Sequence, residues 1–293
     1  MHEAAVVAIS RLNLVDNWVT PFMRISNSIP KPARMEEFLA PFRESGKPVF
    51  LQLMGTDMVM LAECAALAKG IGVAGIDLNF GCPSNQVLRN GAGGGILKHP
   101  DRAAKIAAGV KSAIGDLPLS IKTRIGFASP EEQEYLLPAL AQSCVLSHLT
   151  VHFRTVCEQY RPAPNREYRL KRAAELAAPV PVVGNGDILS TQEARKLAAT
   201  CGLAGVMIGR GFFRHPEILH ELNHAGSPFE GGEALRRKLF GEILRYALEK
   251  PGFRFSNGCA IESANLLWGK GNTVLERLKG ASADGWKKLV EEF

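Results

Sequence analysis

The sequence lacks the long apolar runs and the export signal of a membrane or secreted protein. None of its 293 residues belongs to a run near the ~18 consecutive apolar residues that a membrane-spanning helix needs. The opening residues, MHEAAVVAIS, contain no basic region followed by an apolar core, unlike a secretory signal. We therefore expect a cytoplasmic protein with no membrane partner.

Paired cysteines are also absent. The six cysteines stand at 64, 82, 144, 157, 201 and 259, with no CxxC pair and no Cys/His cluster of zinc-site spacing. Scattered cysteines are typical of a reducing compartment, where most act as small buried apolar residues. The sequence therefore predicts neither a disulfide framework nor a metal site.

A strong excess of one charge is missing as well. The chain has 35 Lys and Arg against 29 Asp and Glu, a formal net charge of +6. This mild excess permits an acidic partner but is equally typical of a solvated surface. Charge alone does not predict nucleic-acid binding.

What the chain does contain is a regular alternation of short apolar runs and longer helical patterns between residues 48 and 225. Apolar residues at helical spacing fill the segments between the runs, for example Met58–Gly70. Such β–α units predict a parallel sheet covered by helices. The predicted strands lie within 17–25, 48–55, 74–83, 119–126, 147–155, 180–188 and 204–211.

Polar residues follow nearly every predicted strand. In a TIM-type (β/α)8 barrel these strand ends converge on one mouth, whereas a doubly wound sheet gathers its ligand groups at a switch point. The pattern therefore favours an α/β barrel over a doubly wound sheet. Because only seven strands are predicted, we expect the barrel to lack its first strand.

After residue 225 the alternation of predicted strands and helices ends. A Gly- and Pro-rich connection leads into an amphipathic helix at 234–250, and two further helical stretches follow around 260–268 and 273–293. We expect a barrel domain over residues 1–225 and a small helical domain over 226–293.

The sharpest local motif is DLNFGCPS at 77–84, followed by a glycine-rich run at 90–95. Cys82 comes just after a strand, between a glycine and a proline that fix a tight turn. A thiol at the barrel mouth can donate a proton. We interpret Cys82 as a catalytic acid, although an isolated cysteine is ordinarily a buried structural residue. We also expect the glycine-rich run to be a mobile loop that opens for a bulky substrate.

Basic side chains end two adjacent strands. In IKTRIG, Lys122 and Arg124 lie on one side of a strand, which a barrel interior tolerates when an anionic or electron-rich group is bound. His152 ends the next strand in VHFRT. Surface cations and a core histidine are the alternative interpretations, which the central position of these residues makes weaker.

Two glycine-containing motifs, GNGDI at 184–188 and IGRG at 208–211, follow the last two strands. Glycines there let backbone N–H groups approach a phosphate, and Arg210 adds a fork of donors. A pocket with a phosphate site, a lysine, a histidine and a thiol suits flavin mononucleotide (FMN).

Taken in order, these motifs resemble the tRNA-dihydrouridine synthase family. The resemblance runs from about residue 17 to 225 and includes LQLMG (51–55) and GAGGGILKHP (91–100). It implies FMN-dependent reduction of specific tRNA uridines to 5,6-dihydrouridine, with NADPH as the electron donor. Hydride would pass from the flavin to C6 of the uracil, and Cys82 would protonate C5.

The resemblance also implies roles for individual residues. The target base must leave its stack to reach the pocket, and cations around the mouth and helical domain would hold the RNA. We expect a monomer. By resemblance, the flavin ring or ribityl chain would contact Gln52, Lys122 and His152. The flavin phosphate would contact Asn185, Gly186, Asp187, Gly209 and Arg210. The target uracil would contact Asn79, Arg124, Tyr160 and Arg161.

Three departures from the family keep alternatives open. Residues 1–14 contain no Ala-Pro-Met-type turn, so either the start is misplaced or the first strand is lost. Phe153 stands where a glycine is common, and residues 253–270 match the expected basic pattern poorly. One alternative is a flavin barrel oxidoreductase acting on a small molecule, like a dihydroorotate or dihydropyrimidine dehydrogenase. The other is an inactive, N-terminally truncated RNA-binding relative.

Overall fold

Short parallel strands form the centre of the molecule. A computed structural model of the chain describes residues 2–224, 231–250, 256–278 and 283–293. The strands pair in the order β1-β3-β4-β5-β6-β7-β8, and β2 also pairs with β3. They are β1 (Trp18–Val19), β2 (Met23–Arg24), β3 (Val49–Met54), β4 (Gly75–Phe80), β5 (Leu119–Arg124), β6 (His148–His152), β7 (Val182–Asn185) and β8 (Gly205–Met207).

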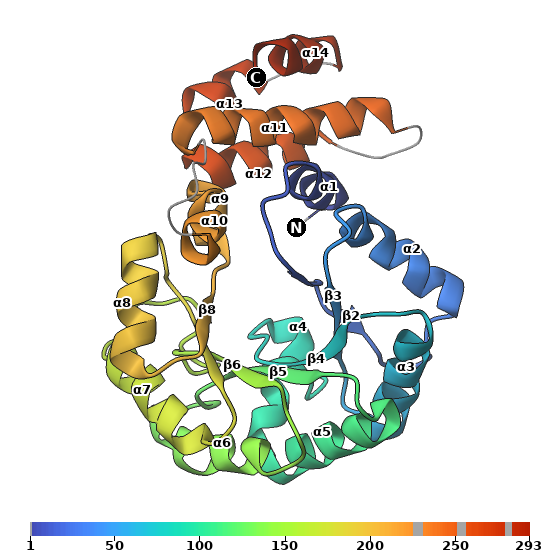
Figure 1. Ribbon diagram of the computed structural model, residues 1–293, viewed down its shortest axis with the longest axis vertical. Coiled ribbons are helices and arrows are strands. Elements are labelled where there is room, and N and C mark those ends of the chain that lie inside the picture. Colours follow the sequence, from blue (N-terminus) through green and yellow to red (C-terminus); the bar gives the residue numbers. More distant parts are fainter. Residues whose placement is uncertain (1, 225–230, 251–255, 279–282) are drawn as a thin grey trace.

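The sheet curls into a barrel that is open on one side (Figure 1). β1 and β2 share one position beside β3, and Pro21, which has no N–H to give to the ladder, stands between them. Within the described residues no strand joins β8 to β1. The predicted TIM-type barrel with one strand missing is confirmed.

Helices cover the outside of the barrel (Figure 1). Capping residues begin several of them: Asp57 accepts a hydrogen bond from Met60 N (2.9 Å), and Ser190 accepts one from Glu193 N (3.2 Å). No helix in the described ranges is long and apolar enough to cross a membrane. The outer helices are α2 (Pro32–Arg43), α3 (Met58–Gly70), α5 (Pro100–Ile114), α6 (Gln133–Ala141), α7 (Arg166–Ala177) and α8 (Thr191–Cys201).

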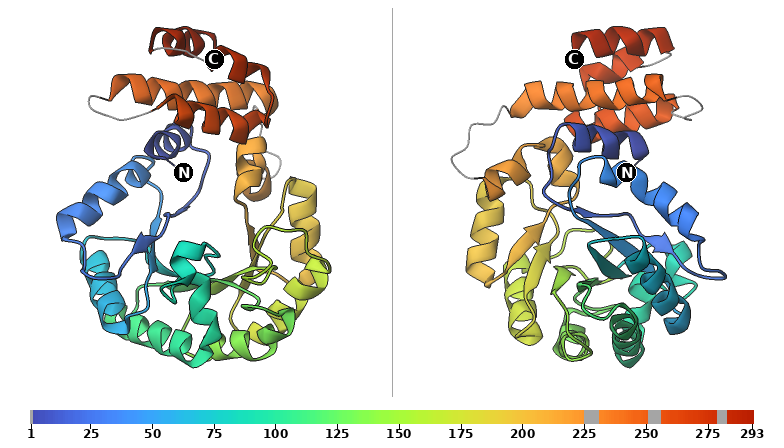
Figure 2. Two further views of the ribbon diagram at one scale, coloured as in Figure 1. Left: turned by 180° about the vertical axis from the view of Figure 1, so that it is seen from behind. Right: turned by 45° about the vertical axis from the view of Figure 1, so that its right-hand side comes forward.

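The C-terminal helices form a separate layer at the open side of the barrel (Figures 1 and 2). The predicted helices at 234–250 and 260–268 are present, whereas the predicted stretch 273–293 contains two helices, and residues 279–282 lie outside the described residues. The layer contains α11 (Gly232–Glu249), α12 (Asn257–Trp268), α13 (Thr273–Leu278) and α14 (Ala283–Glu292), and the short helices α9 (Arg210–Arg214) and α10 (Ile218–Asn223) lead to it.

An N-terminal helix that the sequence pattern did not predict, α1 (Glu3–Arg11), packs against α11. Its residues from Ala4 to Ser10 are all buried. His2 hydrogen-bonds Ser263 of α12 (2.8 Å), and Arg11 lies 3.5 Å from Glu242 of α11. The two ends of the chain therefore pack together beside the open side of the barrel.

The glycine-rich run after Cys82 is folded: residues 92–95 are buried and only Asn90 is exposed, while the predicted mobility of the run stays a prediction. Its residues form the 3-10 helix η1 (Gly93–Lys98), and Gly94 N donates to Cys82 O (3.0 Å). A methyl group at position 94 would lie 2.5 Å from a methyl carbon of Val156. Gly93 and Gly94 permit close packing beneath the Cys82 turn, where a side chain would collide.

We expect Gly94→Ala to lower the free energy of unfolding by about 1–3 kcal/mol, because the added methyl group overpacks this contact. Gly95→Ala is the matched control, since its methyl group would meet only atoms of Leu88, at ordinary distances of 3.4 Å to 3.8 Å. Urea denaturation of both variants measures the difference. Equal stability of the two would show that the run is not packed as described.

Candidate active site

A cavity of about 1160 Å³ lies at the carboxyl ends of the strands and extends to α11 and α12. It brings together residues that are far apart in the sequence, as expected where barrel strands converge. Most of the predicted site residues line it: Asn79, Cys82, Lys122, Arg124, His152, Tyr160, Asn185, Gly186, Asp187, Gly209 and Arg210.

Two predicted residues do not line this cavity. Gln52 is buried below it, where its amide bonds Asp77 (2.7 Å) and Asn79 (2.8 Å). Arg161 directs its guanidinium away, donating to the backbone carbonyl of Cys157. The structure therefore places Gln52 in a supporting layer and Arg161 outside the site.

Cys82 lies on a turn that Asn79 holds in place. Asn79 Oδ1 accepts hydrogen bonds from the backbone N–H groups of Gly81 (3.2 Å) and Cys82 (3.0 Å). Gly81 must be small, since a methyl group there would lie 3.2 Å from the backbone of Thr123. The half-buried thiol thus stands on a fixed turn at the cavity wall.

Lys122 and His152 offer hydrogen-bond donors from neighbouring strands. The pKa of Lys122 is lowered to about 8, chiefly by burial; Asp77 opposes this shift and the nearby Arg124 adds to it. Burial also lowers the pKa of His152 to about 2, so this imidazole is neutral. Its Nδ1 accepts from Arg154 N (3.2 Å), which leaves the ring proton on Nε2.

Arg124 hydrogen-bonds the loops that follow β4 and β6, on both sides of the site. Its Nε donates to Gly81 O (3.0 Å), and its Nη1 donates to Thr155 O (2.7 Å) and Gln159 O (2.9 Å). Its guanidinium carbon also lies 5.7 Å from the centre of the Tyr160 ring. Much of its hydrogen-bonding capacity therefore serves the protein itself.

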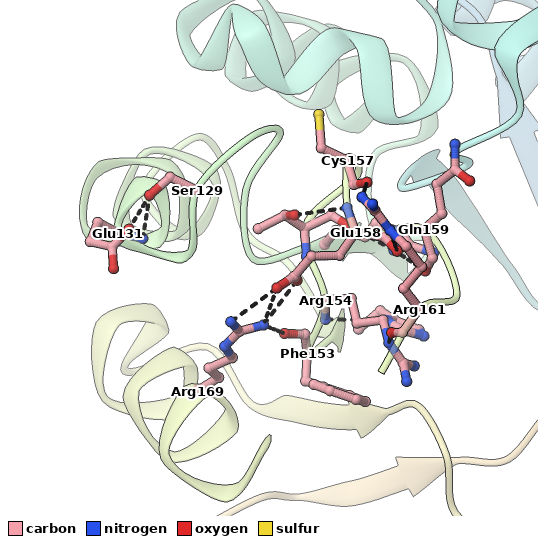
Figure 3. Close-up of polar contacts among 12 residues, drawn as sticks. Ser129, Glu131, Phe153, Arg154, Cys157, Glu158, Gln159, Arg161 and Arg169 are labelled. Carbon is pink, nitrogen blue, oxygen red and sulfur yellow. Dashed lines mark hydrogen bonds and ion pairs between the residues drawn. The ribbon is translucent and has the colours of Figure 1, made fainter. Parts of the chain in front are cut away.

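The loop after β6, which carries Tyr160, is held by buried arginines (Figure 3). Arg169 of α7 forms a bidentate pair with Glu158 (2.9 and 3.0 Å). Arg154 donates to Arg161 O (2.6 Å) and to the carboxylate of Asp187. The exposed Tyr160 ring is consequently presented on a fixed loop at the cavity.

Asp187 and Arg210 meet where the loops after β7 and β8 come together. Arg154, which hydrogen-bonds Asp187, keeps the pKa of that carboxyl below its ordinary value, and Arg210 lies 3.8 Å from it. A carboxylate repels phosphate, so Asp187 can serve a phosphate only through its backbone and by orienting arginines. At Gly209 an added methyl group would meet no protein atom within 4 Å, so the backbone borders open space.

The sequence patterns did not predict the residues that form the outer wall of the cavity. The lining contains five Lys and Arg residues against a single carboxylate, Asp187, so it favours an anionic ligand. Arg214 could have been noticed, because it stands one helical turn after Arg210. Phe22 lies in the predicted run 17–25 and His215 directly follows α9, whereas Arg236, Leu267 and Trp268 come from α11 and α12, which only the tertiary fold brings to the barrel.

Comparison with known families identifies the chain. The model of the family described as Dihydrouridine synthase (Dus) matches residues 9–238. The chain belongs to the dihydrouridine synthase family. This confirms the family, and with it the oxidoreductase class, that the sequence motifs predicted.

Individual relatives agree with this assignment. The chain is 33% identical to the tRNA-dihydrouridine(16) synthase of Pseudomonas syringae pv. tomato, over 73% of this chain and 69% of the relative. It is 36% identical to that of Cupriavidus necator, over 69% of this chain and 63% of the relative. The chain thus spans about two thirds of the length of these dihydrouridine synthases.

Solved structures share the fold at low sequence identity. The old yellow enzyme of Trypanosoma cruzi aligns with a TM-score of 0.55 at 11% identity, covering 80% of this chain and 85% of that one. The old yellow enzyme homologue of Zymomonas mobilis aligns with a TM-score of 0.54 at 11% identity, covering 78% and 85%. These matches support the barrel assignment.

Proposed function

We propose that this dihydrouridine synthase family member reduces a uridine of tRNA to 5,6-dihydrouridine, with FMN as cofactor and NADPH as reductant. The observation that carries the proposal is that Cys82, Lys122, His152 and Arg210 line one cavity. The names of the relatives in Pseudomonas syringae and Cupriavidus necator supply the tRNA substrate and point to position 16.

The cavity fits FMN. Its cationic lining suits a phosphate, and the open space beside Gly209 lets backbone N–H groups approach one. Gly186, Asp187 and Arg210 would hold the phosphate end, while Lys122 and His152 would face the ring system. When bound, FMN would supply the hydride for C6 of the uracil.

Cys82 is the proposed proton donor to C5. Its turn is fixed by Asn79, so the thiol has a defined position before any substrate arrives. Lys122 and the Nε2–H of His152 donate hydrogen bonds to electron-rich atoms and thereby orient what binds above them. Arg124 and Tyr160 would form the side of the pocket that receives the uracil.

The outer wall suits RNA better than a small substrate. Arg214 and Arg236 add positive charge beyond the innermost residues, and Trp268 adds an aromatic ring. Bases stack on aromatic rings and phosphates bind arginines, so this wall can hold the nucleotides that flank an extruded uridine. We accordingly assign catalysis to residues 1–225 and RNA binding to residues 226–293, in the cytoplasm, where tRNA is modified.

The direct test incubates the purified chain with NADPH and an unmodified tRNA transcript and measures dihydrouridine by mass spectrometry. We expect a yellow protein that forms dihydrouridine at position 16. Product at another position would correct the site. A yellow protein that reduces free pyrimidines but not tRNA would favour the small-molecule oxidoreductase. A colourless protein that retards tRNA in a gel would favour the inactive RNA-binding relative.

We expect Cys82→Ala to keep bound flavin but to reduce uridine about 10²- to 10⁴-fold more slowly, the usual contribution of a general acid. Cys157→Ala is the control, because Cys157 is exposed and does not line the cavity. Single-turnover assays with pre-reduced enzyme measure the effect. Turnover by Cys82→Ala at the wild-type rate would refute the assigned role.

We expect the affinity of the flavin-free protein for FMN to fall as the pH rises through about 8. Lys122 is protonated below its lowered pKa and loses its charge above it, so its attraction for an anionic ligand is present only at lower pH. Fluorescence titration across about pH 7–9.5 measures this, with Lys122→Met as the comparison. A fall of the same size in Lys122→Met would contradict the assignment.

A further inference from the structure

A chain of buried hydrogen bonds leads from the barrel interior to the backbone of Cys82. Ser120 Oγ donates to Asp77 Oδ1 (2.6 Å), and Gln52 Nε2 donates to Asp77 Oδ2 (2.7 Å). Asn79 Nδ2 then donates to Gln52 Oε1 (2.8 Å), and Asn79 Oδ1 accepts from Cys82 N (3.0 Å). The four side chains of this relay, from Ser120 to Asn79, are at most 8% exposed.

The hydrogen bonds of the relay run in one donor-to-acceptor order, which ends at the Asp77 carboxyl group. Both oxygens of Asp77 accept hydrogen bonds, one from Ser120 and one from Gln52, so Gln52 turns its NH2 group toward Asp77 and its oxygen toward Asn79. Asn79 must then turn its own NH2 toward Gln52. Its oxygen is thereby left facing the N–H groups of Gly81 and Cys82.

The opposite orientation of Asn79 would leave donors facing donors. If the amide were flipped, its NH2 group would meet the N–H of Cys82, and a buried backbone donor would lose its acceptor. The turn would have to move for these groups to find other partners. The orientation of the Asn79 amide therefore determines the position of the Cys82 thiol.

We propose that Asp77 and Gln52 are positioning residues for Cys82, acting through Asn79. This rests on the proposed function, in which Cys82 protonates the uracil. It adds a second role for Gln52 beside the flavin contact that family resemblance implies, since both ends of its amide take part in the relay.

Gln52→Met tests the proposal, because methionine keeps the length of the side chain and removes both polar groups. Without its acceptor, Asn79 is free to turn and the Cys82 turn opens more often. We expect iodoacetamide to alkylate Cys82 about 5- to 10-fold faster, the equivalent of one lost hydrogen bond. Mass spectrometry of the peptide that contains Cys82 separates its alkylation from that of the other cysteines.

The two half-reactions distinguish positioning from a flavin contact. We expect reduced Gln52→Met enzyme to transfer its electrons to tRNA at least about 10-fold more slowly, because the proton donor is misplaced. Reduction of the bound flavin by NADPH should stay within about 2-fold of wild type, because Cys82 plays no part in that step. Gln133→Met is the control: Gln133 is also buried, on α6, away from the cavity, and should match wild type throughout.

Two variants of Asp77 make the test independent of how well Gln52→Met folds. Asp77→Asn can still accept from Gln52 through its amide oxygen while its NH2 faces Ser120, so alkylation should change less than about 2-fold. Asp77→Leu cannot accept and should behave like Gln52→Met.

Unchanged Cys82 alkylation in both Gln52→Met and Asp77→Leu would overturn the proposal. So would unchanged alkylation combined with weaker flavin binding in Gln52→Met, which would assign Gln52 to the flavin. The alkylation comparison does not depend on activity. If wild-type protein fails to reduce tRNA, the proposed function fails, yet alkylation still decides whether the relay holds the turn.

Discussion

The site depends on the alternation of side chains along parallel strands that curve around a common centre. Neighbours in register, such as Arg124 beside His152 and Asn79 beside Lys122, project their side chains into the same interior. That interior is polar, so it is stable only where its groups bond one another or a ligand. Burial of these groups also accounts for the lowered pKa values of Lys122 and His152.

Much of this could be predicted from the sequence because barrel strands and their ends are local patterns. The alternation of apolar runs indicated the strand positions, and polar residues at the run ends correctly predicted a shared cavity that includes Cys82. The bounds of α3, Met58–Gly70, were predicted from apolar spacing. These features need no knowledge of distant contacts.

Features that arise from tertiary packing could not be predicted from the sequence. Gln52 follows the strand pattern of a cavity residue, yet Asp77 and Asn79 engage its amide one layer below. The glycine-rich run was predicted as a loop, but Gly93 and Gly94 pack closely against Cys82 and Val156. Arg236 and Trp268 reach the cavity only because the C-terminal helices lie at the open side of the barrel, which no local pattern encodes.

The most direct measurement is an experimental structure of the Cys82→Ala variant bound to FMN and tRNA. We expect an unstacked uracil inside the cavity, with its C5 atom about 3–3.5 Å from the place that the Cys82 sulfur occupies in the wild-type chain. A uracil bound elsewhere, or with C5 turned away from residue 82, would contradict the proposed role of the strand-end cavity and its thiol.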